Sequence, residues 1–266
     1  MNTADFTMIL IGLATGVVTG LTGASGVMVV VPLVTMLLHF SIHEAVGTSL
    51  LVDVIAPLFI AYTYFRHGRV DIKSGGWIAL GSIFGAQLGS LFASGIPSGG
   101  LSNSFGLFLL LMGALTWKKG FNSAAVTGRL KKFVRFETTA QRTSTSLILG
   151  VLIGIMTGVL GAGGGGMILI VLTFVLDFPL HVALGTSMFI MAITALSGAV
   201  GYALHGNINL LAGVVIGLSA IVGGTLSARF ANRVNEQVLS RAVSTIFIAL
   251  GITMSALNLN GITHHV

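Results

Sequence analysis

The sequence predicts an all-α polytopic membrane protein made of two inverted repeats, each combining a re-entrant broken-helix hairpin with three transmembrane helices. Three observations lead to this prediction: the composition, an internal duplication and the placement of the basic residues. Of the 266 residues, 54% are hydrophobic and only 8% are charged, whereas soluble domains carry roughly 25% charged residues. Long apolar runs without the period-two alternation of barrel strands exclude a transmembrane β-barrel.

The duplication relates the two halves of the chain. A shift of 138 positions pairs residues 12–93 with residues 150–231 and gives 29 identities in 82 positions without a gap. The paired motifs include the glycine-rich stretches at 16–26 and 154–164 and the Gly-Thr-Ser triplets at 47–49 and 185–187. We therefore predict a first repeat over residues 1–117, a basic linker over 118–142 and a second repeat over 143–266, all within one transmembrane domain.

The basic residues indicate that the two repeats are inverted. All thirteen Lys and Arg residues fall in three clusters, at 66–73, 118–142 and 229–241, and the positive-inside tendency places such clusters in the cytoplasm. The loop after the second apolar segment is basic in the first half and uncharged in the second, and the next loop reverses this pattern. The same loop therefore lies inside in one repeat and outside in the other. This predicts a cytoplasmic linker and both termini outside.

Two apolar runs, at residues 6–38 and 145–177, are each 33 residues long and are interrupted near the centre by glycine. One spanning helix needs only about 20 residues, whereas two arms of about 12–16 residues each reach roughly 18–24 Å at 1.5 Å per residue. We therefore predict one re-entrant hairpin from each face. Six full spans complete the prediction, at 45–65, 75–93, 104–117, 182–204, 211–228 and 242–258.

The glycine-rich tips of these hairpins are the predicted binding site for an anion. The second arm of each hairpin starts at the tip, where a helix N-terminus presents free N–H groups and a positive dipole end. Inverted repeats with interrupted helices at the midplane are typical of secondary transporters. The predicted substrate contacts are Thr19, Thr22, Gly23, Ala24, Ser25, Gly26, Thr48, Ser49, Gln87, Thr157, Gly161, Ala162, Gly163, Gly164, Gly165, Thr186 and Ser187.

Two structural alternatives apply to these residues. Small residues also let helices pack closely in membranes, and helix-interior Ser and Thr often donate a hydrogen bond to a carbonyl of the preceding turn. Either role would leave the side chain without a contact to substrate.

Asp53 is the predicted ion-coupling residue. It lies about ten residues into an apolar segment, and its repeat mate is Met191. A carboxylate near the bilayer centre costs about 2.5–3.5 kcal/mol on insertion scales, so a functional role is the default. Proton coupling is one interpretation, and a neutral structural carboxyl that donates one hydrogen bond is the other.

His43 and His181 are predicted on opposite faces, one turn before the glycine of each triplet, which suggests gating and makes a shared metal site unexpected. The sequence has no cysteine and no recurring nucleophile–base pair. We therefore expect neither a cofactor nor an enzyme.

The same residues carry a resemblance to a known family. The glycine-rich stretches at 16–26 and 158–166, the paired triplets and the Tyr-x-x-His-Gly loops at 64–68 and 202–206 resemble the sulfite exporter TauE/SafE family of membrane permeases. The resemblance covers nearly the whole chain. It implies a secondary transporter of the bacterial inner membrane that moves sulfite, sulfonates or related organosulfur anions by alternating access, with proton-coupled export.

An anion channel, or a carrier for other small anions such as carboxylates, is the alternative function. The expected partners are a small anionic substrate and the lipid bilayer, without nucleic acid. A homodimer is left open.

Overall fold

The computed structural model describes residues 3–22, 25–119, 139–161, 164–176, 178–231 and 236–259, and these are helical almost throughout. The helices are α1 (Thr3–Thr22), α2 (Val27–Leu37), α3 (Ile42–Arg66), α4 (Ile72–Ser94), α5 (Ser98–Lys119), α7 (Thr139–Leu160), α8 (Gly165–Ile170), the π-helix η1 (Val171–Val175), α9 (Leu180–Leu204), α10 (Leu210–Ala231) and α11 (Glu236–Leu259). The predicted all-α class is confirmed. Most of the predicted linker, residues 120–138, lies outside the described residues.

Five helices in the described part of the chain are long and apolar enough to cross a membrane. They are Ile42–Arg66, Gly75–Ser94, Ala140–Leu160, Val182–Leu204 and Leu210–Ser227. Four of them match predicted spans, and the fifth belongs to α7. The predicted spans at 104–117 and 242–258 lie in α5 and α11, whose apolar stretches are shorter.

Both long apolar runs are interrupted near the predicted positions. We call residues 23–26, between α1 and α2, the first break, and residues 161–164, between α7 and α8, the second break. The arm after each break is short. The arm after the first break is α2, which has 11 residues, and the arm after the second consists of α8 with 6 residues and η1 with 5. At 1.5 Å per residue these arms are about 16 Å long.

The arm before each break is longer than predicted. α1 has 20 residues and α7 has 22, which corresponds to about 30–33 Å. The expectation of 12–16 residues is therefore wrong for the first arms. The physical reason is that both helices continue into polar residues, since α1 begins at Thr3 and α7 at Thr139, before the apolar runs start. Counting apolar residues alone underestimates such a helix.

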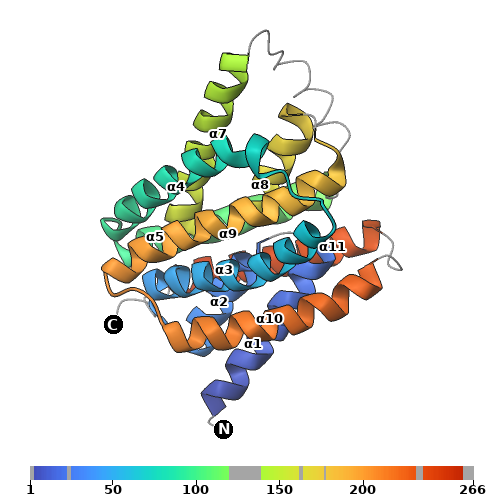
Figure 1. Ribbon diagram of the computed structural model, residues 1–266. Helices are drawn as coiled ribbons and strands as arrows, with labels where there is room; N and C mark the ends of the chain where they lie inside the picture. The colour runs from blue at the N-terminus through green and yellow to red at the C-terminus, as the bar shows by residue number, and fades with distance from the viewer. Residues whose placement is uncertain are drawn as a thin grey trace.

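The two halves contact each other through reciprocal helix pairs. α1 of the first half packs along α10 of the second half, and α7 of the second half packs along α4 of the first. α3 packs against α9, and α5 against α11. Figure 1 shows α9, α3 and α10 side by side across the middle of the molecule, with α7 above them and α1 below.

Glycine permits the close approach of these pairs. A Cβ atom on Gly16 would overlap the backbone of Ala220, and a Cβ on its repeat mate Gly154 would overlap the backbone of Ser82. Small residues that let backbones touch are the usual basis of helix association in lipid. Gly12 and Gly16 of α1 and Gly150, Gly154 and Gly158 of α7 therefore have a packing role.

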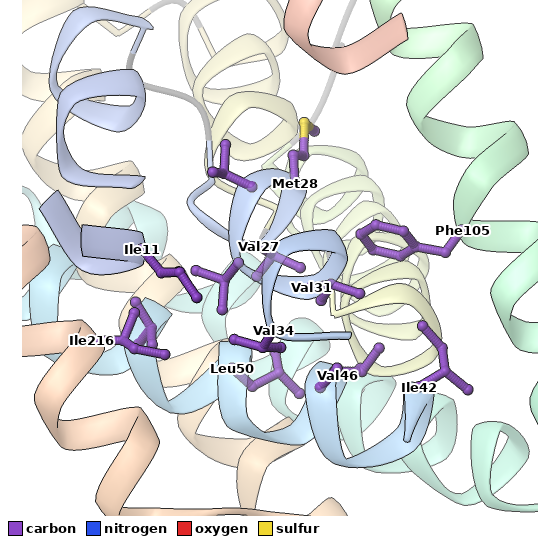
Figure 2. Close-up of a cluster of buried hydrophobic side chains, with 14 of the residues drawn as sticks. Ile11, Val27, Met28, Val31, Val34, Ile42, Val46, Leu50, Phe105 and Ile216 are labelled. Carbon is purple, nitrogen blue, oxygen red and sulfur yellow. The ribbon is translucent and has the colours of Figure 1, made fainter. Parts of the chain in front are cut away.

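The short helix α2 lies in the centre of the main hydrophobic core. Val27, Val30, Val31 and Val34 are completely buried, and α2 carries apolar residues on every face, as expected for a helix enclosed by other helices. Figure 2 shows its side chains surrounded by labelled residues of α1, α3, α5 and α10. The start of α2, at the first break, is consequently held inside the protein.

Candidate functional site

The start of α2 is hydrogen-bonded to a buried carboxyl group. Asp53 projects from α3 and is 2% exposed. Its Oδ2 accepts a hydrogen bond from the Ser25 hydroxyl, and its Oδ1 accepts one from the backbone N–H of Gly26 at 3.3 Å. The Ser25 oxygen in turn accepts the N–H of Val27 at 3.3 Å. The first break is thus hydrogen-bonded to the carboxyl group of Asp53 through an amide and a hydroxyl.

Gly26 is required at this point because α1 and Asp53 come close to it. A Cβ atom on Gly26 would lie 2.6 Å from Cγ2 of Thr15, 3.5 Å from Oδ1 of Asp53 and 3.7 Å from Cγ2 of Thr19. The predicted site residues Thr19, Ser25, Gly26 and Asp53 are therefore brought together. The hydroxyl of Thr19 donates to the carbonyl of Thr15 within its own helix.

Sequence reasoning missed Thr15. This residue is 1% exposed, and its hydroxyl has no hydrogen-bond partner in the part of the chain that the structure describes. It lies one helical turn before Thr19, and residues four apart share a helix face. That spacing is the signal that could have placed both threonines beside the break.

The second break lies beside the start of α2. Gly161 has a positive φ of 65°, a conformation that glycine adopts without steric cost. A Cβ atom there would lie 2.8 Å from Val46, 3.3 Å from the Ser49 hydroxyl and 3.4 Å from Val27. The end of α7, the start of α2 and the Ser49 turn of α3 therefore meet at one place.

The environment of the second break differs from that of the first. A Cβ atom on Gly164 would overlap Ile153 and lie 3.4 Å from the Thr157 hydroxyl, which donates to the Ile153 carbonyl at 2.9 Å. A Cβ atom on Gly165 would overlap the sulfur of Met191, the repeat mate of Asp53. The first break therefore faces a carboxylate, whereas the second faces a thioether.

The threonines of the two Gly-Thr-Ser triplets bind the opposite half of the protein. The Thr48 hydroxyl accepts the backbone N–H of Asn209 at 3.0 Å, and the Thr186 hydroxyl accepts that of Asp71 at 2.9 Å. We call these two contacts the joints. Asn209 and Asp71 directly precede α10 and α4, respectively. Each joint therefore fixes the start of one helix to the other repeat.

The glycines of the triplets serve the same joints. A Cβ atom on Gly47 would overlap the Asn207 carbonyl, and one on Gly185 would overlap the Arg69 carbonyl. Ser49 and Ser187 follow the predicted alternative, because their hydroxyls donate to carbonyls of their own helices, at 2.7 and 2.9 Å. Contact between substrate and Thr48, Ser49, Thr186 or Ser187 stays a prediction.

Gln87 and His43 have partners elsewhere. The Gln87 amide donates to the Ser197 carbonyl at 2.7 Å, across the interface of α4 and α9. Nε2 of His43 lies 3.0 Å from the Ala93 carbonyl and 3.1 Å from the Ile96 carbonyl, and so braces the connection between α4 and α5. The substrate role of Gln87 and the gating role of His43 stay predictions.

Several predicted residues cannot be placed in the site. Gly23, Ala24, Ala162, Gly163 and the side chains of Thr22 and His181 lie outside the described residues. Within the described ranges, no three His, Cys, Asp or Glu side chains are grouped so as to hold a metal ion.

Comparison with known proteins gives a consistent result along the chain. Residues 8–254 match the family model described as sulfite exporter TauE/SafE. The chain is 29% identical over 244 residues to the probable membrane transporter protein YdhB of Bacillus subtilis, which covers 89% of this chain and 94% of the relative. It is 27% identical over 259 residues to YunE, another probable membrane transporter protein of that organism, with 92% and 94% covered.

A probable membrane transporter protein of Methanocaldococcus jannaschii is 24% identical over 267 residues, with 93% and 94% covered. No solved structure matches the chain. The family model spans nearly the whole chain, and these relatives are described as transporters rather than enzymes. The chain therefore belongs to the sulfite exporter TauE/SafE family of membrane transporters.

Proposed function

We propose that this chain is a secondary transporter that moves small sulfur-containing anions, such as sulfite or sulfonates, across the inner membrane by alternating access. The family description, sulfite exporter, favours export, and coupling of this transport to protons is part of our proposal. The observation that supports the proposal is the start of α2, where a helix N-terminus inside the protein donates hydrogen bonds to the carboxyl oxygens of Asp53 through Ser25 and Gly26.

Two inverted halves are part of this proposal. The duplicated sequence and the reciprocal pairs α1 with α10 and α7 with α4 support a two-fold relation between the repeats. The alternating charge of equivalent loops supports opposite orientations in the membrane. Rocking of one repeat against the other around a central site is the usual route to alternating access in such folds.

The chemistry of the breaks suits a small, weakly held oxyanion. No Lys or Arg lies inside the apolar segments, so backbone N–H groups and hydroxyls are the available donors. Helix N-termini bind anions through such groups. In the proposed mechanism the substrate binds between the two breaks and Asp53 carries the coupled proton. His43 and His181 act as gating residues on opposite faces.

The test is an uptake panel in proteoliposomes, with sulfite, sulfate, thiosulfate, a taurine-like sulfonate and a carboxylate, each with and without a proton gradient. The proposal expects flux of sulfite or a sulfonate that responds to the gradient and is altered in Asp53→Asn. Flux that ignores both the gradient and this substitution would identify an anion channel. Transport of the carboxylate alone would contradict the proposed cargo.

A further inference from the structure

Asp53 is held by the same kinds of group that the proposed function assigns to the substrate. Its two carboxylate oxygens accept the Ser25 hydroxyl and the Gly26 amide at the start of α2. α2 has 11 residues, and its N-terminus lies in the core rather than in water. The side chain of Thr15 lies against Gly26 through its Cγ2 methyl, and its buried hydroxyl has no hydrogen-bond partner among the described residues.

This arrangement exists in one half only. At the second break the residue that corresponds to Asp53 is Met191, whose thioether lies against Gly165 and cannot replace an oxyanion. Among the described residues the duplicated site is therefore asymmetric, with a carboxyl group at the first break and a thioether in the corresponding place at the second.

We propose that the Asp53 carboxylate is a built-in competitor of the transported anion, so that protonation of Asp53 opens the first break to substrate. This inference rests on the proposed function. One proton converts the carboxylate into a neutral carboxyl, which removes its negative charge. Ser25 and Gly26 then become available to donate to a free oxyanion. Deprotonation returns the carboxylate to both donors and expels that anion.

This competition determines the direction in which the proton moves relative to the anion. Proton and anion are bound together and released together, so one proton travels with each singly charged anion in the same direction. Export by this route proceeds when the anion gradient outweighs an inward proton gradient, and an inward proton gradient by itself drives uptake.

Several other titratable groups lie on the helices around Asp53, but none of them in the described part of the chain is its hydrogen-bond partner. Within the described residues its hydrogen bonds go to Ser25 and Gly26 alone. α2 carries no titratable side chain, and α1 carries Asp5 in its first turn. Those on α3 and on its neighbours α5, α9 and α10 are His43, Glu44, Tyr62, Tyr64, Arg66, Lys118, Lys119, His181, Tyr202 and Arg229.

The experiment measures binding of formate to purified protein in detergent, by calorimetry and by thermal stabilisation, at acidic and at alkaline pH. Formate replaces the deleted carboxylate and stays singly charged over this range. The wild type should bind formate more strongly at acidic pH. Asp53→Ala should bind it equally at both, with an affinity at alkaline pH about 10-fold or more above the wild type, because charge-assisted hydrogen bonds to the anion are regained.

Met191→Ala is the matched control, since it shortens the equivalent side chain at the second break without removing a carboxylate. It should keep the pH dependence of the wild type. Absence of formate binding to Asp53→Ala, or wild-type binding that does not change with pH, would overturn the inference. The wild-type measurement keeps the test decisive if Asp53→Ala does not fold. Uptake of sulfite by the wild type is measured separately, so that failure of the proposed transport function can be distinguished from failure of the proposed competition by Asp53.

Discussion

Replacing Thr48 by valine should weaken the joint between the two repeats. Thr48 is completely buried, and its hydroxyl accepts the N–H of Asn209 at 3.0 Å across 161 positions of sequence. Valine has nearly the same shape but offers no acceptor. The N–H at the start of α10 would therefore lose this partner inside the protein.

Two kinds of measurement bound the loss in free energy of unfolding expected for Thr48→Val. Leaving a buried donor without its acceptor costs about 1–3 kcal/mol, whereas side-chain hydrogen bonds between membrane helices average about 0.6 kcal/mol and reach about 1.7. We expect Thr48→Val to lower the free energy of unfolding by about 1–2 kcal/mol, a factor of roughly 5–30 in the folded-to-unfolded ratio. Thr186→Val, which removes the acceptor of the Asp71 N–H at 2.9 Å, should have a similar cost.

The assay is reversible unfolding in detergent micelles, followed by far-UV circular dichroism. Ser49→Ala is the control in the same triplet, because the Ser49 hydroxyl donates to its own helix at the Val46 carbonyl, at 2.7 Å. It should change stability by less than about 0.5 kcal/mol, and Thr48→Ser should retain most of the wild-type stability. Equal stability of Thr48→Val and the wild type would contradict a stabilising role for the hydrogen bond between Thr48 and Asn209. An equal loss of stability in Ser49→Ala would contradict it as well.

Two further predictions concern the second break and the interface of α4 and α9. Gly164→Val should abolish transport in proteoliposomes while the protein still inserts into the membrane, because any side chain at this position overlaps its buried surroundings. Gly166→Val is the control and should be tolerated, since nothing lies within 4 Å of a Cβ atom there. Gln87→Leu should lower stability by about 0.5–1.5 kcal/mol, since the hydrogen bond to Ser197 is lost, whereas its repeat mate Thr225, bonded only within its own helix, should tolerate leucine.

Features that follow from local composition were predictable. Glycine in the middle of a long apolar run predicts an interrupted helix, and both interruptions occur at those glycines. The buried carboxylate Asp53 could be singled out because charge is rare in apolar segments. In both cases the physical cause lies within a short stretch of sequence.

Features that depend on which helices pack together were not predictable. The hydrogen bond between Thr48 and Asn209 joins positions that are 161 residues apart in the sequence. Hydrogen bonding within the same helix, the alternative considered for the Gly-Thr-Ser triplets, occurs for Ser49 and Ser187 but not for the threonines. The role of Thr15 likewise depends on how α1 approaches the first break. A single sequence does not indicate these pairings.

The opposite orientation of the two repeats in the membrane underlies the proposed central site. Arg66 and Leu204 are repeat mates at the ends of α3 and α9, both are exposed, and the natural sequence has no cysteine. Single cysteines placed at these positions can be labelled in intact cells with a membrane-impermeant maleimide. Inverted repeats predict labelling of Leu204→Cys from outside and protection of Arg66→Cys until the membrane is opened. Labelling of both from the same side would contradict inverted repeats and the central site built on them.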